Sequence, residues 1–256
     1  MTTSGRLDGT VALVTGASSG IGAATARALA AEGALVVAAA RRKDRLDEVV
    51  EDIVDAGGRA TVCELDVTDQ TAAAAAVDGV VAEHGRLDVV VNNAGMMLNG
   101  PVEDAPLDEW ERMVDINVKG LLYVAHAALP HLLVAAEAEP RRVADMVNIS
   151  SVAGRVPRLG AGVYNLTKHG VGAFSESLRQ EVTERHVRVS LVEPGAVATE
   201  LLDHQRPDVR EAYQNRFRGK DLLQATDVAD AIAYLVTRPR HVAINEVLVR
   251  PTQQQA

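Results

Sequence analysis

Short apolar runs alternate along the chain with longer segments whose apolar residues recur at the period of a helix. The short runs are almost continuously apolar, which is typical of strands buried on both faces. Strands are expected at residues 11–15, 35–40, 60–65, 87–92, 146–150, 187–192 and 246–249. Helical patterns lie between them, for example at residues 21–32, 44–56, 71–83, 118–136 and 167–185.

This alternation predicts an α/β fold, because parallel strands need a crossover connection that is usually a helix. We expect a single doubly wound Rossmann domain over residues 1–256, with a seven-stranded parallel sheet and helices on both faces. No low-complexity or Pro/Gly/Ser-rich linker interrupts the pattern. The region at about 195–224 departs from it, because it is long, mostly polar and rich in arginine. Such excursions are often lids or binding loops, so we expect a substrate lid there.

Composition narrows the function classes. The chain is 47% hydrophobic and 24% charged, as in an ordinary globular protein, and its net charge of −9 disfavours a nucleic-acid partner. No apolar stretch reaches the roughly 18 residues of a membrane span, and residues 1–8 lack the apolar core of a secretory signal, so we expect a cytoplasmic protein. Cys63 is the only cysteine and is expected in the core. His126 and His131 point about 140° apart on a helix, so no metal site is expected.

A glycine-rich turn follows the first predicted strand and opens a helix. It reads Gly16, Ala17, Ser18, Ser19, Gly20, Ile21, Gly22. The free N–H groups and the positive end of the helix dipole attract a pyrophosphate there, and glycines let the backbone approach it. No Lys-Ser or Lys-Thr pair follows the last glycine, which disfavours a phosphoryl-transfer loop. We expect a dinucleotide site, with tight helix–strand packing as the alternative reason for the glycines.

The end of the second predicted strand indicates which dinucleotide is bound. An NAD site places a carboxylate there, whereas a 2′-phosphate needs cations. Ala40 occupies the acidic position, and Arg41 and Arg42 follow it. We interpret this pattern as a preference for NADP(H); a solvated basic turn is the alternative.

Tyr164 and Lys168 are four positions apart in the chain, which places the phenol and the ammonium on one face of a helix. A nearby ammonium favours phenolate, and we expect it to move the pKa of Tyr164 toward the working range of an acid/base catalyst. Ser150 and Ser151 end a predicted strand, where doubly wound sheets bind ligands. Taken alone, the pair is equally consistent with a partly buried tyrosine beside a surface lysine.

Together these residues resemble the short-chain dehydrogenase/reductase family, with five motifs in order over nearly the whole chain. Residues 15–22 look like its cofactor turn, and residues 92–95 match its N-N-A-G motif. The catalytic tetrad is matched by Asn117, Ser151, Tyr164 and Lys168. Further positions that resemble cofactor contacts are Asp66, Val67, Asn93, Ala94, Gly95, Pro194, Gly195 and Thr199.

The resemblance implies an NADP(H)-dependent oxidoreductase acting on a small carbonyl or alcohol. Ser151 would polarise the substrate oxygen while Tyr164 gives it a proton. Lys168 would hold the nicotinamide ribose, and Asn117 would anchor a water that links Lys168 to solvent. Residues 92–101 and 247–252 are most similar to a bacterial branch that includes clavulanic acid dehydrogenase, which points to an aldehyde or ketone reductase of secondary metabolism. The family resemblance also implies a homotetramer.

Several alternatives stay open. A nucleotide-binding fold does not itself imply chemistry, so a catalytically silent NADP-binding sensor is the second hypothesis. Met96, Met97 and Leu98 fit either an apolar substrate pocket or the core. Candidate partners of a substrate carboxylate, or simply exposed cations, are Arg155, Arg206, Arg210, Arg216 and Arg218. A stripe that would permit close approach of another helix is formed by Leu166, Gly170, Ala173 and Ser177.

Overall fold

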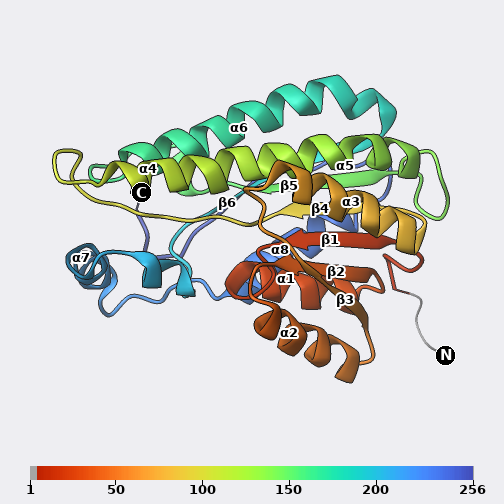
Figure 1. The fold of residues 1–256 in the computed structure, drawn as a ribbon, viewed down its shortest axis with the longest axis horizontal. Coiled ribbons are helices and arrows are strands. Elements are labelled where there is room, and N and C mark those ends of the chain that lie inside the picture. The colour runs from red at the N-terminus through yellow and green to blue at the C-terminus, as the bar shows by residue number, and fades with distance from the viewer. Residues whose placement is uncertain (1–4, 256) are drawn as a thin grey trace.

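The computed structural model describes residues 5–255, and its centre is one parallel sheet of seven strands in the order β3-β2-β1-β4-β5-β6-β7 (Figure 1). The strands are β1 (Val11–Thr15), β2 (Leu35–Ala40), β3 (Arg59–Glu64), β4 (Val89–Asn92), β5 (Ala144–Ile149), β6 (Val187–Pro194) and β7 (Glu246–Val249). Every neighbouring pair is parallel. The predicted fold class is confirmed, and each predicted strand is found within two residues of its expected ends.

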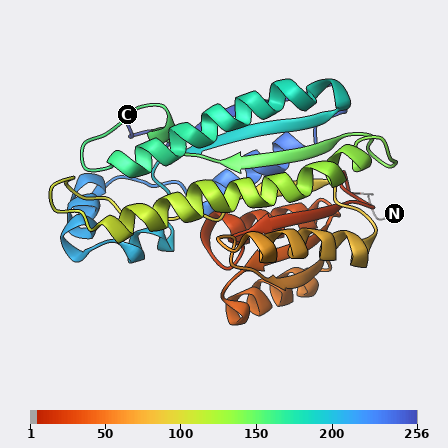
Figure 2. The ribbon, with the colours of Figure 1, turned by 45° about the horizontal axis from the view of Figure 1, so that its top comes forward.

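Helices cover both faces of the sheet (Figures 1 and 2). On one face lie α1 (Gly20–Ala31), α2 (Lys43–Asp55) and α8 (Ala225–Val236). On the other lie α3 (Gln70–His84), α5 (Leu121–Ala135) and α6 (Gly162–Val182). Because both faces are covered, all residues of β1, β4, β5 and β6 are buried, which explains why most of their residues are apolar.

The first three strands are added to the sheet in one direction from β1, and the later strands are added on its other side, so β1 lies between β2 and β4. The helical connections that follow β1 and β4 therefore cross opposite faces of the sheet. A crevice forms between their carboxyl ends, which is the usual ligand position in this architecture. The glycine-rich turn follows β1 directly, so the topology places it at this crevice.

The helix expected at residues 118–136 is part of a longer one. It begins as α4 (Leu107–Val114), passes through a π-helical turn at Asp115–Gly120 and continues as α5. Leu107–Ala135 is long and apolar enough to meet the length and composition criteria for a membrane span, which the sequence was not expected to contain. Its apolar character has another explanation, because Val124, Ala128 and Leu132 are fully buried against the sheet.

Two boundaries differ from the sequence prediction in ways that matter for the site. Helix α6 begins at Gly162 rather than at residue 167, so Tyr164 and Lys168 both lie within it. The segment 195–224 is not a simple loop: it holds a 3-10 turn at Glu200–His204 and α7 (Pro207–Phe217). Helix α7 has no buried residue and projects beyond the end of the sheet, beside the start of α4 (Figures 1 and 2). With no apolar stripe, its sequence carried no helical pattern to detect.

Candidate active site

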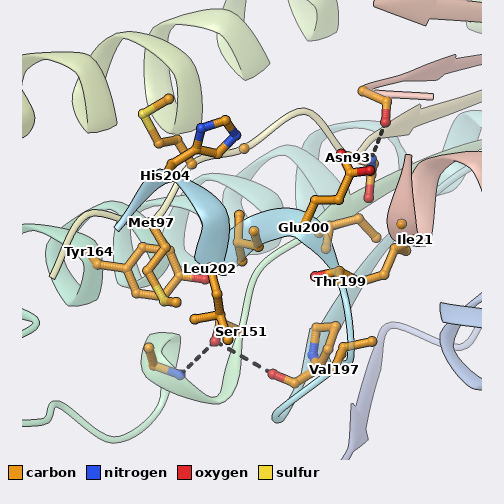
Figure 3. A pocket seen from close by; sticks show the side chains of 18 of the residues that line it. Ile21, Asn93, Met97, Ser151, Tyr164, Val197, Thr199, Glu200, Leu202 and His204 are labelled. Carbon is orange, nitrogen blue, oxygen red and sulfur yellow. Dashed lines mark hydrogen bonds between the residues drawn. The ribbon is translucent and has the colours of Figure 1, made fainter. Parts of the chain in front are cut away.

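A cavity of 390 Å³ lies along the carboxyl ends of the strands, from the glycine-rich turn to Tyr164 (Figure 3). The loops that follow β1 to β6 each contribute to its wall. The predicted site residues that line it are Gly16, Ser18, Ser19, Gly20, Ile21, Arg41, Arg42, Asp66, Val67, Asn93, Ala94, Gly95, Ser151, Tyr164, Lys168, Pro194, Gly195 and Thr199. Gly22 and Asn117 are not in the wall, so their predicted roles must be indirect.

The glycines of the turn serve both purposes considered for them. Gly16 has a φ of +65°, and a Cβ there would lie 2.8 Å from the Cα of Ala94. A Cβ on Gly22 would lie 2.3 Å from the carbonyl oxygen of Gly16, closer than any real side chain comes. Gly22 therefore lets α1 pack tightly under the turn. Gly16 and Gly20 form the open cradle in the cavity wall that a pyrophosphate requires.

Asn93 fixes the position of this cradle. Its Nδ2 donates to the carbonyl oxygen of Thr15 at 3.0 Å. The Thr15 hydroxyl oxygen in turn accepts from the backbone N–H groups of Asn93 and Ala94, both at 3.1 Å. The loops after β1 and β4 are thus held together across the crevice. Sequence reasoning placed Asn93 among cofactor contacts; its amide is used to position the backbone around the cofactor space.

Two arginines line the same end of the cavity. Arg42 donates to the hydroxyl of Ser19 at 2.9 Å and lies 3.0 Å from the carboxylate of Glu200. Arg41 lies 3.9 Å from the carboxylate of Asp66, with its side chain 60% exposed. Ala40, at the position where an NAD site needs an acid, is buried. The cradle and these two cations together fit a dinucleotide with a 2′-phosphate.

At the opposite end, Ser151 and Tyr164 face each other. The Ser151 oxygen accepts from the N–H of Ala153 at 3.1 Å, and its hydroxyl donates to the carbonyl oxygen of Pro194 at 3.5 Å. These bonds fix the serine hydroxyl in the cavity wall, as Figure 3 shows. The neighbouring Ser150 instead donates to the carbonyl oxygen of Lys168 at 3.0 Å. Ser151 is therefore the serine available to a ligand, and Ser150 ties β5 to α6.

Burial controls the acid/base properties of the pair in α6. It raises the pKa of Tyr164 to about 12, against the smaller opposing effect of the Ser151 hydrogen bond. It lowers the pKa of Lys168 to about 8. The expected shift of Tyr164 toward neutral pH is thus wrong for this structure. Lys168 is 5.8 Å from the tyrosine ring centre, and its Nζ donates to the carbonyl oxygen of Ile149 at 2.8 Å. The phenol stays protonated at neutral pH, which suits a proton donor.

Asn117 lies in the π-helical turn between α4 and α5 and is buried. Its Oδ1 accepts from the N–H of Met96 at 2.7 Å. Its Nδ2 donates to the carbonyl oxygen of Met96 at 2.8 Å and to the Thr167 hydroxyl at 3.2 Å. The side chain joins the loop after β4 to α6, directly beside Lys168. Its predicted role as a water anchor stays a prediction.

The space around Tyr164 has an apolar wall. Met96 and Met97 line the cavity and also pack in a buried cluster with Tyr164, so both interpretations of the methionines hold. Sequence reasoning missed the other members of this wall, Leu201, Leu202 and Tyr213. Their only signal was a few apolar residues within the polar segment 195–224. Burial raises the pKa of Tyr213, which packs in the same apolar cluster as Tyr164.

Other sequence candidates lie away from the cavity. Arg155 is paired with Glu193 and with Glu246, so it is not a free partner for a substrate carboxylate as considered from the sequence. Cys63 is only half-buried, at the edge of the core, and burial raises the pKa of its thiol. His131 lies 3.1 Å from Asp78. Within residues 5–255, no cluster of metal-ligating side chains is found.

Comparison with known proteins is consistent with this geometry. The family model for short chain dehydrogenases matches residues 10–210. The chain is 40% identical over 250 residues to glycine betaine reductase ATRR of Emericella nidulans, covering 98% of this chain but 19% of that longer protein. It is 36% identical to an uncharacterized oxidoreductase of Staphylococcus saprophyticus, covering 95% of this chain and 96% of the relative.

Two solved structures are similar along nearly their whole length. A metagenomic short-chain oxidoreductase in complex with NADP has a TM-score of 0.81 and 36% identity, with 97% of this chain and 100% of that chain covered. The closed form of a serine dehydrogenase complexed with NADP+ has a TM-score of 0.87 and 32% identity, with coverages of 96% and 97%. The similarity to the clavulanic acid dehydrogenase branch stays a prediction.

Proposed function

This chain belongs to the short-chain dehydrogenase family, and from that premise we propose that it is an NADP(H)-dependent oxidoreductase that interconverts a carbonyl compound and its alcohol. The observation that carries the proposal is that one cavity joins the glycine cradle to the Ser151–Tyr164 pair. A nucleotide that extends from the cradle along this cavity brings its reactive ring to the phenol. Bound NADP(H) supplies the hydride chemistry.

The protein's own residues supply binding and proton transfer. The Ser151 hydroxyl hydrogen-bonds to the substrate oxygen and polarises the carbonyl. Tyr164 gives its phenolic proton to that oxygen during reduction and takes it back during alcohol oxidation. Its raised pKa of about 12 keeps the proton available across the neutral range. Lys168, held by the carbonyl oxygen of Ile149, presents a cation beside the space for the nicotinamide ribose.

Support for NADP comes from the second strand and from the relatives. Ala40 supplies no acid at the position where NAD needs one, and Arg41 and Arg42 lie beside the same space. Two similar structures contain NADP. An enzyme that uses this reductant fits a cytoplasmic location, which is part of the proposal.

Replacing Tyr164 with phenylalanine tests the proposal. We expect Tyr164→Phe to lower kcat for NADPH-dependent carbonyl reduction by about 10²- to 10⁴-fold, because the proton donor is removed. NADPH affinity, measured by fluorescence titration, should stay within about 3-fold, since the phenol contributes little to cofactor binding energy. Tyr234→Phe is the matched control, because Tyr234 is exposed on α8 and outside the cavity wall.

A different outcome would favour the second hypothesis, a silent NADP-binding sensor. In that case the wild-type protein binds NADPH tightly but does not consume it with any member of a carbonyl panel. Equal consumption by wild type and Tyr164→Phe would instead contradict the assigned role of the phenol.

We also propose a homotetramer that uses the outer surface of α5 and α6. The four members of the α6 stripe, from Leu166 to Ser177, are all exposed, and Leu166 is 64% exposed. Val134 on the adjacent α5 is 71% exposed. Large exposed apolar side chains beside small residues fit close helix packing between subunits. Light scattering of wild type and Leu166→Glu tests this proposal, with dissociation expected in the variant.

A further inference from the structure

The two ends of the cavity differ in how their charges are paired. Its wall contains two carboxylates, Asp66 and Glu200. Both lie at the cofactor end, where Asp66 is 3.9 Å from Arg41 and Glu200 is 3.0 Å from Arg42. The acids in the wall are therefore already matched by the arginines that face the nucleotide.

Arg158 and Arg216 line the other end of the cavity, and no acidic residue lines it with them. Within residues 5–255, neither guanidinium forms an ion pair with a carboxylate. The Nη2 atom of Arg158 is buried and has no hydrogen-bond partner. Burial is the main cause that lowers the pKa of Arg158, and the nearby cations Arg216 and Arg250 lower it further. A cation surrounded by other cations and partly removed from water is costly unless an anion joins it.

These two arginines line the same cavity as Ser151 and Tyr164. The carbonyl oxygen of Arg158 accepts from Nδ2 of Asn165 at 3.0 Å, which ties the arginine's loop to α6 at the residue after Tyr164. Tyr213 packs in one apolar cluster with Tyr164 and lines the cavity together with both arginines. A ligand whose reacting oxygen contacts Ser151 and Tyr164 therefore shares one cavity with the two guanidinium groups.

We propose that the substrate carries a carboxylate as well as the carbonyl or hydroxyl group, and that Arg158, assisted by Arg216, binds this carboxylate. The inference rests on the proposed oxidoreductase function and specifies its substrate class as oxo acids and hydroxy acids. A guanidinium presents two parallel N–H donors to a carboxylate, and such charge-assisted bonds are strong when they are shielded from water. The apolar wall of Met97, Leu201 and Leu202 accommodates the carbon chain between the two polar ends.

Matched substrates provide the kinetic test. The ω-oxo acids of four to six carbons and their methyl esters differ chiefly in the negative charge. We expect wild-type kcat/KM to favour the best acid over its ester by about 10-fold or more. Arg158→Ala should lower kcat/KM for that acid by about 10- to 100-fold, mainly through KM, and change the ester by less than about 3-fold. For Arg158→Lys, kcat/KM for the acid should lie between the values for wild type and Arg158→Ala. Lysine keeps the positive charge but loses the two parallel N–H donors of the guanidinium group.

Two further variants complete the kinetic series. Arg216→Ala should have a smaller effect than Arg158→Ala, because Arg216 is exposed to solvent. Arg218→Ala is the matched control: it removes a positive charge from the same segment, and its guanidinium contacts Asn215 outside the cavity wall. We expect no change in acid preference for this control.

A binding measurement separates this inference from the proposed function. Calorimetric titration of the NADP⁺-loaded protein with alkanoates of four to six carbons and with the corresponding amides needs no turnover. We expect an alkanoate to bind at least about 10-fold more tightly than its amide, and Arg158→Ala to abolish the difference. Thermal melting with and without NADP⁺ establishes that each variant is folded.

The outcomes are distinguishable. Arginine-dependent alkanoate binding without reduction of any carbonyl would support the carboxylate site and contradict the oxidoreductase function. Reduction of acids and esters at equal rates, unchanged in Arg158→Ala, would support the function and overturn the carboxylate site. Equal binding of alkanoates and amides by folded wild-type protein would overturn it as well.

Discussion

The cofactor end of the cavity and the substrate end are built from different parts of the molecule. The cofactor end uses the backbone of a glycine-rich turn, an amide that braces two strand ends, and arginines with nearby acids. The substrate end uses side chains from the loops after β4 and β5, from α6 and from the segment 195–224. In the part of the chain that the structure describes, no acidic residue lines this end with its arginines. Both ends lie at the same edge of one sheet.

This difference shows how one fold combines constant cofactor binding with variable substrate preference. A backbone cradle leaves little room for substitution, because glycine is required by contacts of less than 3 Å at Gly16 and Gly22. A wall built from side chains of separate segments changes its shape and polarity when any one of those side chains is substituted. The cofactor is therefore recognisable from short motifs, whereas substrate preference depends on how distant segments meet.

Within the cofactor end, the largest effect is expected from a substitution in the backbone of the glycine-rich turn. Gly16→Ala forces a side chain into a φ of +65° and to within 2.8 Å of the Cα of Ala94. Strain and displacement of about 3 kcal/mol should weaken NADPH binding by roughly 100-fold. Fluorescence titration measures the loss.

Gly79→Ala is the control for this substitution. Gly79 lies in α3, and a Cβ there meets no atom within 4 Å. It should leave NADPH affinity unchanged and raise the free energy of unfolding slightly, because alanine favours a helix. Unaltered NADPH affinity in Gly16→Ala would show that the cradle tolerates a side chain and that the contrast between the two ends is not one of backbone against side chain.

A smaller effect is expected from the charges at the cofactor end. Arg41→Ala should weaken NADPH binding by about 10-fold and NADH binding by less than about 2-fold, since only NADPH carries the 2′-phosphate. The high exposure of Arg41 limits the size of the effect. Arg45→Ala, which removes an exposed cation from α2 outside the cavity wall, is the control. Unchanged selectivity in Arg41→Ala would remove the argument for a cationic 2′-phosphate site.

The smallest effect concerns Lys168, where the two ends meet. Its pKa of about 8 lies below its ordinary value of 10.5, so above pH 8 the folded protein binds fewer protons than the unfolded chain. The free energy of unfolding should therefore rise with pH, by about 1 kcal/mol between pH 8 and 9. The raised pKa of Tyr164 acts only above pH 10, in the opposite direction.

Urea unfolding of wild type and Lys168→Met at pH 8 and at pH 9 checks this expectation. The lysine-dependent rise is the difference between the two proteins, since other groups titrate equally in both. A difference of zero would mean that Lys168 is not desolvated in the folded protein, and that the cation faces water rather than the closed end of the cavity.

Some elements of the fold were predictable from the sequence and others were not. The strands and the cofactor turn were predicted because their signals are local: a continuous apolar run, or glycines between a strand and a helix. Helix α7 was missed because it buries none of its residues and has no apolar stripe. The apolar pattern at residues 167–185 did not reach the start of α6, since Gly162 is a poor helix former, although the spacing of Tyr164 and Lys168 had already placed both on one helix face.

By itself, the sequence determined the fold class, the position of the dinucleotide cradle and the set of candidate catalytic residues. These depend on periodicity and on motifs a few residues long. Only the tertiary structure decided which charges are paired and which groups are desolvated. Arg42 pairs with Glu200, 158 residues away in the chain. Among residues 5–255, no carboxylate forms an ion pair with Arg158, and burial rather than Lys168 sets the pKa of Tyr164. Pairing and desolvation are properties of neighbours in space, and the chain order of those neighbours gives no direct sign of them.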